Sequence, residues 1–401
     1  MPSCMETLTM MFIVYMSLPL GYGRQGETRV CHLQKSLYGL KQASHNWYSK
    51  LSTVLLSDGF TQSQADHSLF TRQTGSIILV VLVYVDDLLV TGNDLLSIRR
   101  LQEFLSSKFQ LKNLGKLKYF VGIEVARSAK GIFINQRKYV LDILADAGQS
   151  GCCPASSPME QHLKLSTDFG DPISDPSSYR WLIGRLIYLT ISRPDITFAV
   201  NLLNQFMHTP WVPHFDAAIR ILRYLKGSVS HGLLFSSSSA LSLTGYTDSD
   251  WASCPMTRRS TTGYFITLGT NPVSWRTKKQ SVVSRSSAEA EYRAMASTTC
   301  ELLWLHTLLH NLAVPLSSPI TLHCDNQAAL HIARNPIFHE RSEHIEIDCH
   351  LIRERVQQGL LHLQHIASAD QLADVFTKAL GVDHFRILTS KLGITSLHAP
   401  F

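Results

Sequence analysis

Two neighbouring aspartates in the first half of the chain could bind divalent cations. Asp86 and Asp87 interrupt an otherwise apolar stretch, ILVVLVYVDDLLVTGN, whose two flanks read as strands. Charges at a tight apolar hairpin must be exposed or bound to something positive. Paired carboxylates on a stiff hairpin can hold two divalent metals, which activate an attacking hydroxyl and stabilise a leaving group. A solvated turn is the alternative interpretation of two acids between strands.

Four more acids, all in the second half, stand in separate short motifs. They are Asp248 in GYTDSDWA, Glu291 in SSAEAEYRA, Asp325 in LHCDNQAAL and Asp374 in DQLADVFTKAL. Three aspartates and a glutamate placed near the ends of helices and strands are what a two-metal nuclease needs. One metal activates a water and the other stabilises the leaving oxygen of an in-line displacement. For each acid taken singly, an ordinary surface charge is the alternative.

The elements around the first acidic pair alternate between strands and helices. Asp94 is a suitable N-cap for the helix that follows the acidic strand pair. Hydrophobic periodicity predicts the following elements: helices over Gln42–Ser57, Asp94–Phe109 and Lys138–Ala147, strands over Ser68–Arg72, Ile77–Tyr84 and Leu88–Thr91, and a hairpin of Tyr119–Arg127 with Gly131–Asn135.

A linker and a helical region separate the two acidic regions. Gly148–Asp175 is rich in Gly, Ser, Pro and Cys and has no steady period, so it reads as a linker. Tyr179–Lys226 is mainly helical, with a break at Arg193-Pro194. The four serines of Ser236–Ser239 are typical of a flexible join.

The last part of the chain has a mixed α/β pattern. A long helix over Ser287–His310 follows three strands, and further strands and helices alternate after it. The predicted strands are Leu241–Thr247, Gly263–Leu268, Val273–Arg276, Ile320–Cys324 and Leu361–Ile366, and the later helices begin at Gln327 or cover Arg341–Gln358 and Gln371–Leu380. Asp374 would therefore lie on the final helix.

Length, charge and cysteine usage narrow the class of protein. A chain of 401 residues suggests two or three domains, and a formal net charge of +6 fits a nucleic-acid binder without identifying one. None of the eight cysteines forms a C-x-x-C pair, which favours reduced thiols in an intracellular protein over a zinc ribbon or a secreted disulfide scaffold. A cytoplasmic particle and the nucleus both stay open. No membrane association is expected, because Met10–Leu20 lacks a basic leader and Ile77–Val85 is shorter than the roughly 18–20 residues of a membrane span.

Several long motifs resemble the Pol polyproteins of copia-type LTR retrotransposons. YVDD after an apolar strand resembles the active-site signature of reverse transcriptases, and LVYVDDLLVTG resembles the copia-type form of it. VCHLQKSLYGLKQASHNWY, from Val30 to Tyr48, and YFVGIEVAR, from Tyr119 to Arg127, are similar to the same family. In the second half, RRSTTGYF, SWRTKKQ and NPIFHERSEHIEI resemble the ribonuclease H (RNase H) domain of these elements.

For the first half, the resemblance implies a polymerase site. Asp86 and Asp87 would be metal ligands, Tyr38, Lys41 and Gln42 would line the nucleotide pocket, and Val85 would lie near the primer end. The family's first metal-binding aspartate would lie upstream of Val14–Met16, outside this chain, so polymerase activity is expected to be weak or absent. Cys4–Phe12 resembles nothing in the family, which suggests a change of reading frame before the similarity begins.

For the second half, the resemblance implies an intact nuclease site that uses Mg²⁺ or Mn²⁺. Asp248, Glu291, Asp325 and Asp374 would be the catalytic metal ligands. Asp250 and Glu289 are neighbours that could be confused with them. Asp248 is preferred because it ends its predicted strand, and Glu291 because its helix position corresponds to the acid of the family.

Together these features predict an α/β protein of three parts. Residues 1–127 would be a truncated fingers and palm region with an α+β fold, 128–240 a helical thumb and connection, and 241–401 an RNase H-like domain with a mixed five-stranded sheet. The partners would be an RNA–DNA hybrid, an RNA template, a DNA primer and, if the polymerase is competent, dNTPs. The alternative is a catalytically dead relic or a nucleic-acid-binding protein derived from a transposon.

Overall fold

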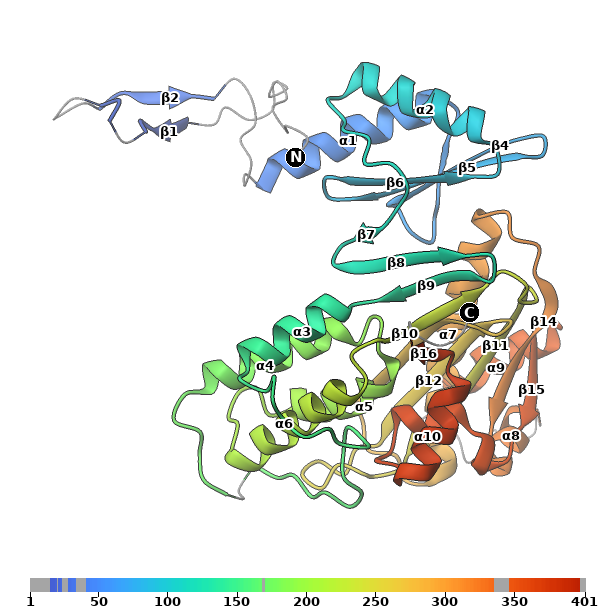
Figure 1. The fold of residues 1–401 in the computed structure, drawn as a ribbon. Helices are drawn as coiled ribbons and strands as arrows, with labels where there is room; N and C mark the ends of the chain where they lie inside the picture. Colours follow the sequence, from blue (N-terminus) through green and yellow to red (C-terminus); the bar gives the residue numbers. More distant parts are fainter. Residues whose placement is uncertain are drawn as a thin grey trace. The chain divides into compact units, whose positions relative to one another are not determined.

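The chain divides into two compact units, each described here by itself (Figure 1). The computed structural model describes residues 15–19, 21–23, 28–33, 41–167, 170–334 and 346–396, with only the backbone described at 41–43 and 317–318. The first unit comprises Met1–Lys116 and Thr307–Val314, and the second comprises Leu117–His306 and Pro315–Phe401. The domain boundaries predicted at residues 127 and 240 stay a prediction.

The first unit packs two helices against an antiparallel sheet. The sheet has the order β3-β4-β5-β6, and the helices are α1 and α2. The bounds are α1 Lys41–Ser57, β3 Thr61–Gln62, β4 Leu69–Thr74, β5 Ile77–Tyr84, β6 Asp87–Gly92 and α2 Leu95–Lys108. Trp47, Leu51 and Leu55 of α1 meet Val81 of β5 in the core, as their spacing on one helix face predicts. A separate strand pair joins β1 Tyr15–Ser17 to β2 Val30–His32.

Local signals of the sequence set the elements of this unit. Val83 and Val81 are buried while Tyr84 is exposed, so β5 has one face in the core and its end in solvent. Asp94 caps α2 as predicted, because its side chain accepts a hydrogen bond from the backbone N–H of Ser97 at 2.8 Å. The predicted strands and helices of this unit are confirmed, with bounds that differ by a few residues.

In the second unit, four α-helices and one 3₁₀ turn surround an apolar core. They are α3 Arg137–Asp146, α4 Pro176–Leu189, η1 Pro194–Ile196, α5 Thr197–Asn204 and α6 Val212–Gly227. The helix break predicted at Arg193-Pro194 is confirmed, since α4 ends before it and η1 begins at Pro194. The proline fixes its own backbone angle and lacks an N–H, so the helix cannot continue through it.

A five-stranded sheet of the order β16-β10-β9-β8-β7 lies in the same unit. Its bounds are β7 Tyr119–Phe120, β8 Ile123–Ser128, β9 Gly131–Asn135, β10 His231–Ser236 and β16 Ile394–Ser396. The β8–β9 hairpin is confirmed, but the prediction of one strand over Tyr119–Arg127 is wrong. Val121 and Gly122 have φ values of 47° and 72° and form a tight turn between β7 and β8.

The predicted mixed five-stranded sheet is confirmed (Figure 1). Its order is β13-β12-β11-β14-β15, with bounds β11 Ser242–Asp250, β12 Thr261–Leu268, β13 Asn271–Lys279, β14 Ser317–Cys324 and β15 Leu361–His365. β12 pairs antiparallel with both β11 and β13, whereas β14 is parallel to β11 and to β15. The α/β fold class therefore holds.

Four helices and two 3₁₀ segments accompany this sheet in the described chain. They are α7 Ser287–Asn311, α8 Gln327–Arg334, α9 Glu346–Gln357, η3 Ser368–Asp370, η4 Leu372–Phe376 and α10 Val382–Lys391. The predicted final helix over Gln371–Leu380 is wrong, because that segment forms the short 3₁₀ helix η4 and then a turn. Gln371 accepts from the N–H of Ala373 and donates to the carbonyl of Thr247 at 3.0 Å, which anchors the segment to β11 instead. Among the described residues, no helix combines the length and apolarity that a membrane crossing needs.

The four serines before β11 are not a loose join, contrary to the prediction. The backbone N–H of Ser236 donates to Asn271 at 2.7 Å, and Ser236 also pairs with Gly131 in the β9–β10 ladder. Ser239 accepts a hydrogen bond from the N–H of Thr270 at 2.7 Å. The segment is therefore tied to the β12–β13 turn.

Candidate active site

The five-stranded mixed sheet brings the four acids of the second half together. Asp248 lies near the end of β11, Asp325 directly follows β14, Asp374 lies in η4, and Glu291 lies early in α7. Ligand oxygens of Asp248, Asp325 and Asp374 are all within 4.8 Å of one another. Asp248 is 1% exposed and Asp374 5% exposed, so charges that prefer water are held inside the protein.

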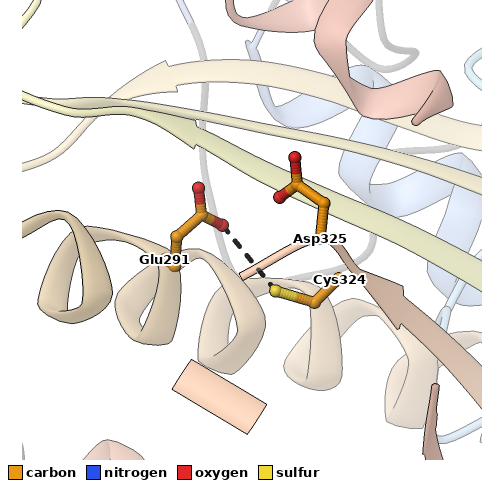
Figure 2. A group of neighbouring side chains, drawn as sticks. All are labelled: Glu291, Cys324 and Asp325. Carbon is orange, nitrogen blue, oxygen red and sulfur yellow. Dashed lines mark hydrogen bonds between the residues drawn. The ribbon is translucent and has the colours of Figure 1, made fainter. Parts of the chain in front are cut away.

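Glu291 joins the same cluster through Asp325. Figure 2 shows Glu291 projecting from α7 and Asp325 beside it, with the thiol of Cys324 below the two carboxylates and joined to Glu291 by a dashed line. Oε1 of Glu291 accepts from the backbone N–H of Ser249 at 3.1 Å, and Oε2 faces the sulfur of Cys324 at 3.9 Å. Ser249, the neighbour of Asp248 on β11, thus holds the Glu291 carboxylate in place. Asp325 belongs to both groups of possible metal ligands, the one with Glu291 and the one with Asp248 and Asp374.

Short polar side chains and one lysine hold the aspartates in place. The Thr377 hydroxyl donates to Oδ2 of Asp248. The ammonium of Lys378 is 3.3 Å from Oδ1 of Asp248 and 2.9 Å from Oδ1 of Asp374. Oδ2 of Asp325 accepts from the Ser368 hydroxyl at 2.8 Å. Thr377 and Lys378 follow directly on η4, so one segment supplies an acid, its positioning hydroxyl and its counter-ion.

Burial and mutual repulsion shift the pKa values of two acids strongly. Burial, followed by the charges of Asp248 and Asp325, raises the pKa of Glu291 to about 9. Burial, followed by the charge of Asp248, raises the pKa of Asp374 to about 7. Burial would lower the pKa of Lys378, but Asp248 and Asp374 raise it above its ordinary value. The acids carry more negative charge than this one lysine neutralises.

The two neighbouring acids that could be confused with the cluster have other surroundings. Glu289 accepts from the guanidinium of Arg293 at 3.1 Å and from the backbone N–H of Arg285 at 2.8 Å. Burial raises the pKa of Asp250, which lies outside both groups of metal-capable side chains among the described residues. β11 continues to Asp250, so the reason given for preferring Asp248, that it ends the strand, is wrong.

The donor set fits a hard divalent cation. Mg²⁺ and Mn²⁺ prefer carboxylate oxygens, and four carboxylates meet here with only one lysine paired to them in the described part of the chain. A divalent cation would supply the positive charge that the cluster lacks. Cys324 is fully buried beside Glu291, and burial raises the pKa of its thiol, so the sulfur is a poor ligand in this setting.

The aspartate pair of the first unit has a different setting. β5 and β6 are joined by a two-residue turn of Val85 and Asp86, since Tyr84 pairs with Asp87. Asp87 is exposed and Asp86 is half-buried. Neither belongs to a group of three metal-capable side chains within the described residues. The two acids are therefore neighbours at a hairpin tip, and in the part of the chain that the structure describes they do not form a three-ligand group like those around Asp325.

The turn itself is conformationally unusual. Val85 has a φ of 49°, in the left-handed region that a β-branched residue rarely adopts, and its side chain is 61% exposed.

Of the predicted nucleotide-pocket residues, Tyr38 lies outside the described residues. Lys41 and Gln42 begin α1, and their side chains are not among those described.

Comparison with known proteins identifies the family. The family described as "Reverse transcriptase (RNA-dependent DNA polymerase)" matches residues 5–161. The retrovirus-related Pol polyprotein from transposon RE1 of Arabidopsis thaliana is 45% identical over 383 residues, which cover 95% of this chain and 26% of that protein. The putative transposon Ty5-1 protein YCL074W of Saccharomyces cerevisiae is 30% identical over 293 residues, which cover 72% of this chain and 95% of that protein. The chain belongs to the copia-type retrotransposon Pol polyproteins.

The match to this Pol family extends over almost the whole chain, but the chain spans only about a quarter of the length of the RE1 polyprotein. The Pol polyprotein from transposon TNT 1-94 of Nicotiana tabacum is similar in this respect, at 33% identity over 96% of this chain and 30% of that protein. The family match begins at residue 5, inside Cys4–Phe12, so the expectation that this stretch resembles nothing in the family is wrong.

Sequence reasoning missed two residues that the structure places in the cluster of the Pol chain. Thr377 and Lys378 contact Asp248, and Lys378 also contacts Asp374. The spacing of Asp374 and Lys378, four residues apart, was a signal for an ion pair on one face of a helix-like turn. Contact of both with Asp248, 129 and 130 residues away, depends on the tertiary fold.

Proposed function

We propose that this Pol fragment cleaves the RNA strand of an RNA–DNA hybrid, with Mg²⁺ or Mn²⁺ as cofactor. The observation that carries the proposal is the cluster of Asp248, Glu291, Asp325 and Asp374, in which every acid except the half-buried Asp325 is buried and which gathers more negative charge than its surroundings neutralise. A protein keeps such a cluster at a cost in stability, so a bound cation and a reaction are its best explanation.

Each residue of the cluster has a part in the proposed site. Bound divalent cations would activate a water and stabilise the leaving oxygen of the scissile phosphodiester. Asp248, Asp325 and Asp374 would hold the cations, with Thr377 and Ser368 fixing the orientation of two of these carboxylates. Glu291, held by the N–H of Ser249, would complete the ligand set.

Nucleic-acid binding in the proposed function rests on charge and groove shape. The chain has a net charge of +6, and Arg276 and Lys278 are exposed on β13, the edge strand of the sheet that carries Asp248. These cations would contact phosphates, and contacts to 2′-hydroxyls of one strand would select RNA over DNA.

The direct test uses a hybrid with its RNA strand labelled at one end. The purified chain should cut the RNA in Mg²⁺ or Mn²⁺ and leave the DNA strand intact. Asp325→Asn should abolish cutting, because it removes a metal ligand with little change in volume. The control is Asp370→Asn, an exposed aspartate paired with Lys391 at 2.7 Å outside the cluster, which should cut like the wild type. Robust cutting by Asp325→Asn would contradict the proposal.

For the first half of the chain we propose a polymerase remnant of low activity. Asp86 and Asp87 would be metal ligands and Val85 would lie near the primer end, as in the related polymerases. Two carboxylates at an exposed hairpin hold divalent cations poorly when no third acid assists them. Primer extension with dNTPs on an RNA template should therefore be absent or far slower than about 1 s⁻¹. Extension at that rate or faster would contradict this part of the proposal.

A further inference from the structure

Lys378 occupies the place where a cation would reach Asp248 and Asp374. Its ammonium is 2.9 Å from Oδ1 of Asp374 and 3.3 Å from Oδ1 of Asp248. The Thr377 hydroxyl donates to Oδ2 of Asp248, so a metal can leave that hydrogen bond in place by binding Asp248 through Oδ1. The lysine contacts that same atom.

We propose that Lys378 is a built-in counter-cation of the metal-free site, and that a divalent cation enters by displacing its ammonium from Asp248 and Asp374. Lys378 is thus a positioning residue: it keeps the carboxylates together while no metal is bound, and it sets how much divalent cation is needed to fill the site. This inference rests on the proposed function, because it concerns the same cluster.

Displacement follows from distance and charge. An Mg²⁺–oxygen bond is about 2.0–2.1 Å long. A metal bound to Oδ1 of both aspartates would lie close to an ammonium that stays about 3 Å from the same two atoms, and like charges so near to each other repel strongly. The side chain of Lys378 is 35% exposed, so its ammonium has a route to solvent.

The first experiment measures metal affinity without any nucleic acid. Mn²⁺ would be titrated into the full chain and its free concentration followed by electron paramagnetic resonance. Lys378→Met keeps the length of the side chain and removes its charge, so Mn²⁺ should bind about tenfold more tightly or better. The matched control is Lys391→Met, which also removes one positive charge but breaks only an exposed pair with Asp370 outside the cluster, and its affinity should match the wild type.

The second experiment uses the wild-type chain, so it does not depend on how the variant folds. Lysines would be acetylated for a short time, and the modification of each would be measured by mass spectrometry with and without Mg²⁺. Lys378 should react several-fold faster with Mg²⁺, because its ammonium has left the carboxylates. Lys391 should react at the same rate in both samples.

The outcomes separate this inference from the proposed function. If wild-type chain binds Mn²⁺, Asp374→Asn does not, and Lys378→Met binds no more tightly than Lys391→Met, the displacement is wrong and the metal site stands. Unchanged acetylation of Lys378 on addition of saturating Mg²⁺ would overturn the inference in the same way. If neither the wild type nor Lys378→Met binds Mn²⁺, the proposed metal site falls and the inference falls with it.

Discussion

Two buried acidic sites in the second unit differ in how their charge is compensated. Asp195 is 2% exposed, and its carboxylate accepts from the Arg193 guanidinium at 2.6 and 2.9 Å and from the Tyr224 hydroxyl at 2.6 Å. Burial would raise the pKa of Asp195, but Arg193 and Tyr224 hold it below its ordinary value. In the Asp248 cluster the balance is reversed, because burial and like charges raise the pKa values of Glu291 and Asp374.

The difference separates a structural carboxylate from a binding site. Arg193 also donates to the carbonyl of Ser228 at 2.9 Å, so the Asp195 pair ties the break after α4 to the end of α6. The charge of Asp195 is therefore compensated within the protein and needs no added ion. In the Asp248 cluster, one lysine does not neutralise the charge of four acids, so an added cation is needed to balance it. This is the condition expected of a metal site.

The largest expected effect on stability is at the compensated pair. Arg193→Met should lower the free energy of unfolding by about 3–5 kcal/mol, because it leaves Asp195 buried and without its cation. Urea denaturation followed by circular dichroism measures this. The control is Arg220→Met, which breaks a partly exposed pair with Glu160 and should cost about 1 kcal/mol or less. Equal losses in the free energy of unfolding of the two variants would contradict the view that the buried Arg193–Asp195 pair stabilises the fold more than an exposed pair does.

A smaller effect with a defined pH dependence is expected at Glu291 in metal-free protein. Its folded pKa is about 9 and its ordinary value 4.5, so between these values the unfolded chain binds fewer protons than the folded chain. Stability is therefore fully present below the unfolded pKa and declines as pH rises toward the folded value. Thermal unfolding in chelator should show stability that falls as pH rises over this range.

The variant Glu291→Gln should remove the part of that decline that lies above about pH 7, since glutamine does not titrate, whereas Asp374, whose pKa is raised to about 7, sustains the decline below that pH. Glu289→Gln serves as the control, because Glu289 is paired with Arg293 and lies outside the cluster, and it should leave the decline in place. A wild-type stability that rises between pH 5 and pH 9 in chelator would show that the cluster is compensated in some other way.

The smallest effects are expected at the hairpin of the first unit. Val85→Gly should raise the free energy of unfolding by about 1 kcal/mol or less, because glycine adopts a positive φ without strain. Asp87→Asn should change it by less than about 0.5 kcal/mol, since the side chain is exposed. Chemical denaturation of both variants checks this. A large loss in Asp87→Asn would mean that the hairpin acids carry a structural charge like that of Asp195.

Short-range signals made much of the fold predictable from sequence. The apolar run of β5, the Asp94 cap and the Arg193-Pro194 break act within a few residues, and each gave an element close to the observed one. The η4 segment could not be predicted in this way, because Gln371 bonds to Thr247, 124 residues away. β16 was missed for the same reason, since three residues form a strand only where they meet β10.

The candidate site shows the same division between local and distant causes. The four acids stand in motifs long enough to be recognised one by one, and the structure brings them together. Their contacts with residues far away in the sequence could not be predicted in this way. Lys378 is four residues from Asp374, but its contact with Asp248 exists only because η4 packs beside β11.

The most direct measurement compares cleavage of the RNA strand by four single variants at saturating Mn²⁺. Asp248→Asn and Glu291→Gln alter acids of the cluster, whereas Asp250→Asn and Glu289→Gln alter their neighbours two residues away. The first two should lose cleavage by about a thousandfold or more, as removal of transition-state charge stabilisation does, and the last two should stay within about tenfold of the wild type. Loss of cleavage in Asp250→Asn or Glu289→Gln, with activity retained in Asp248→Asn or Glu291→Gln, would contradict the assignment of this cluster as the nuclease site.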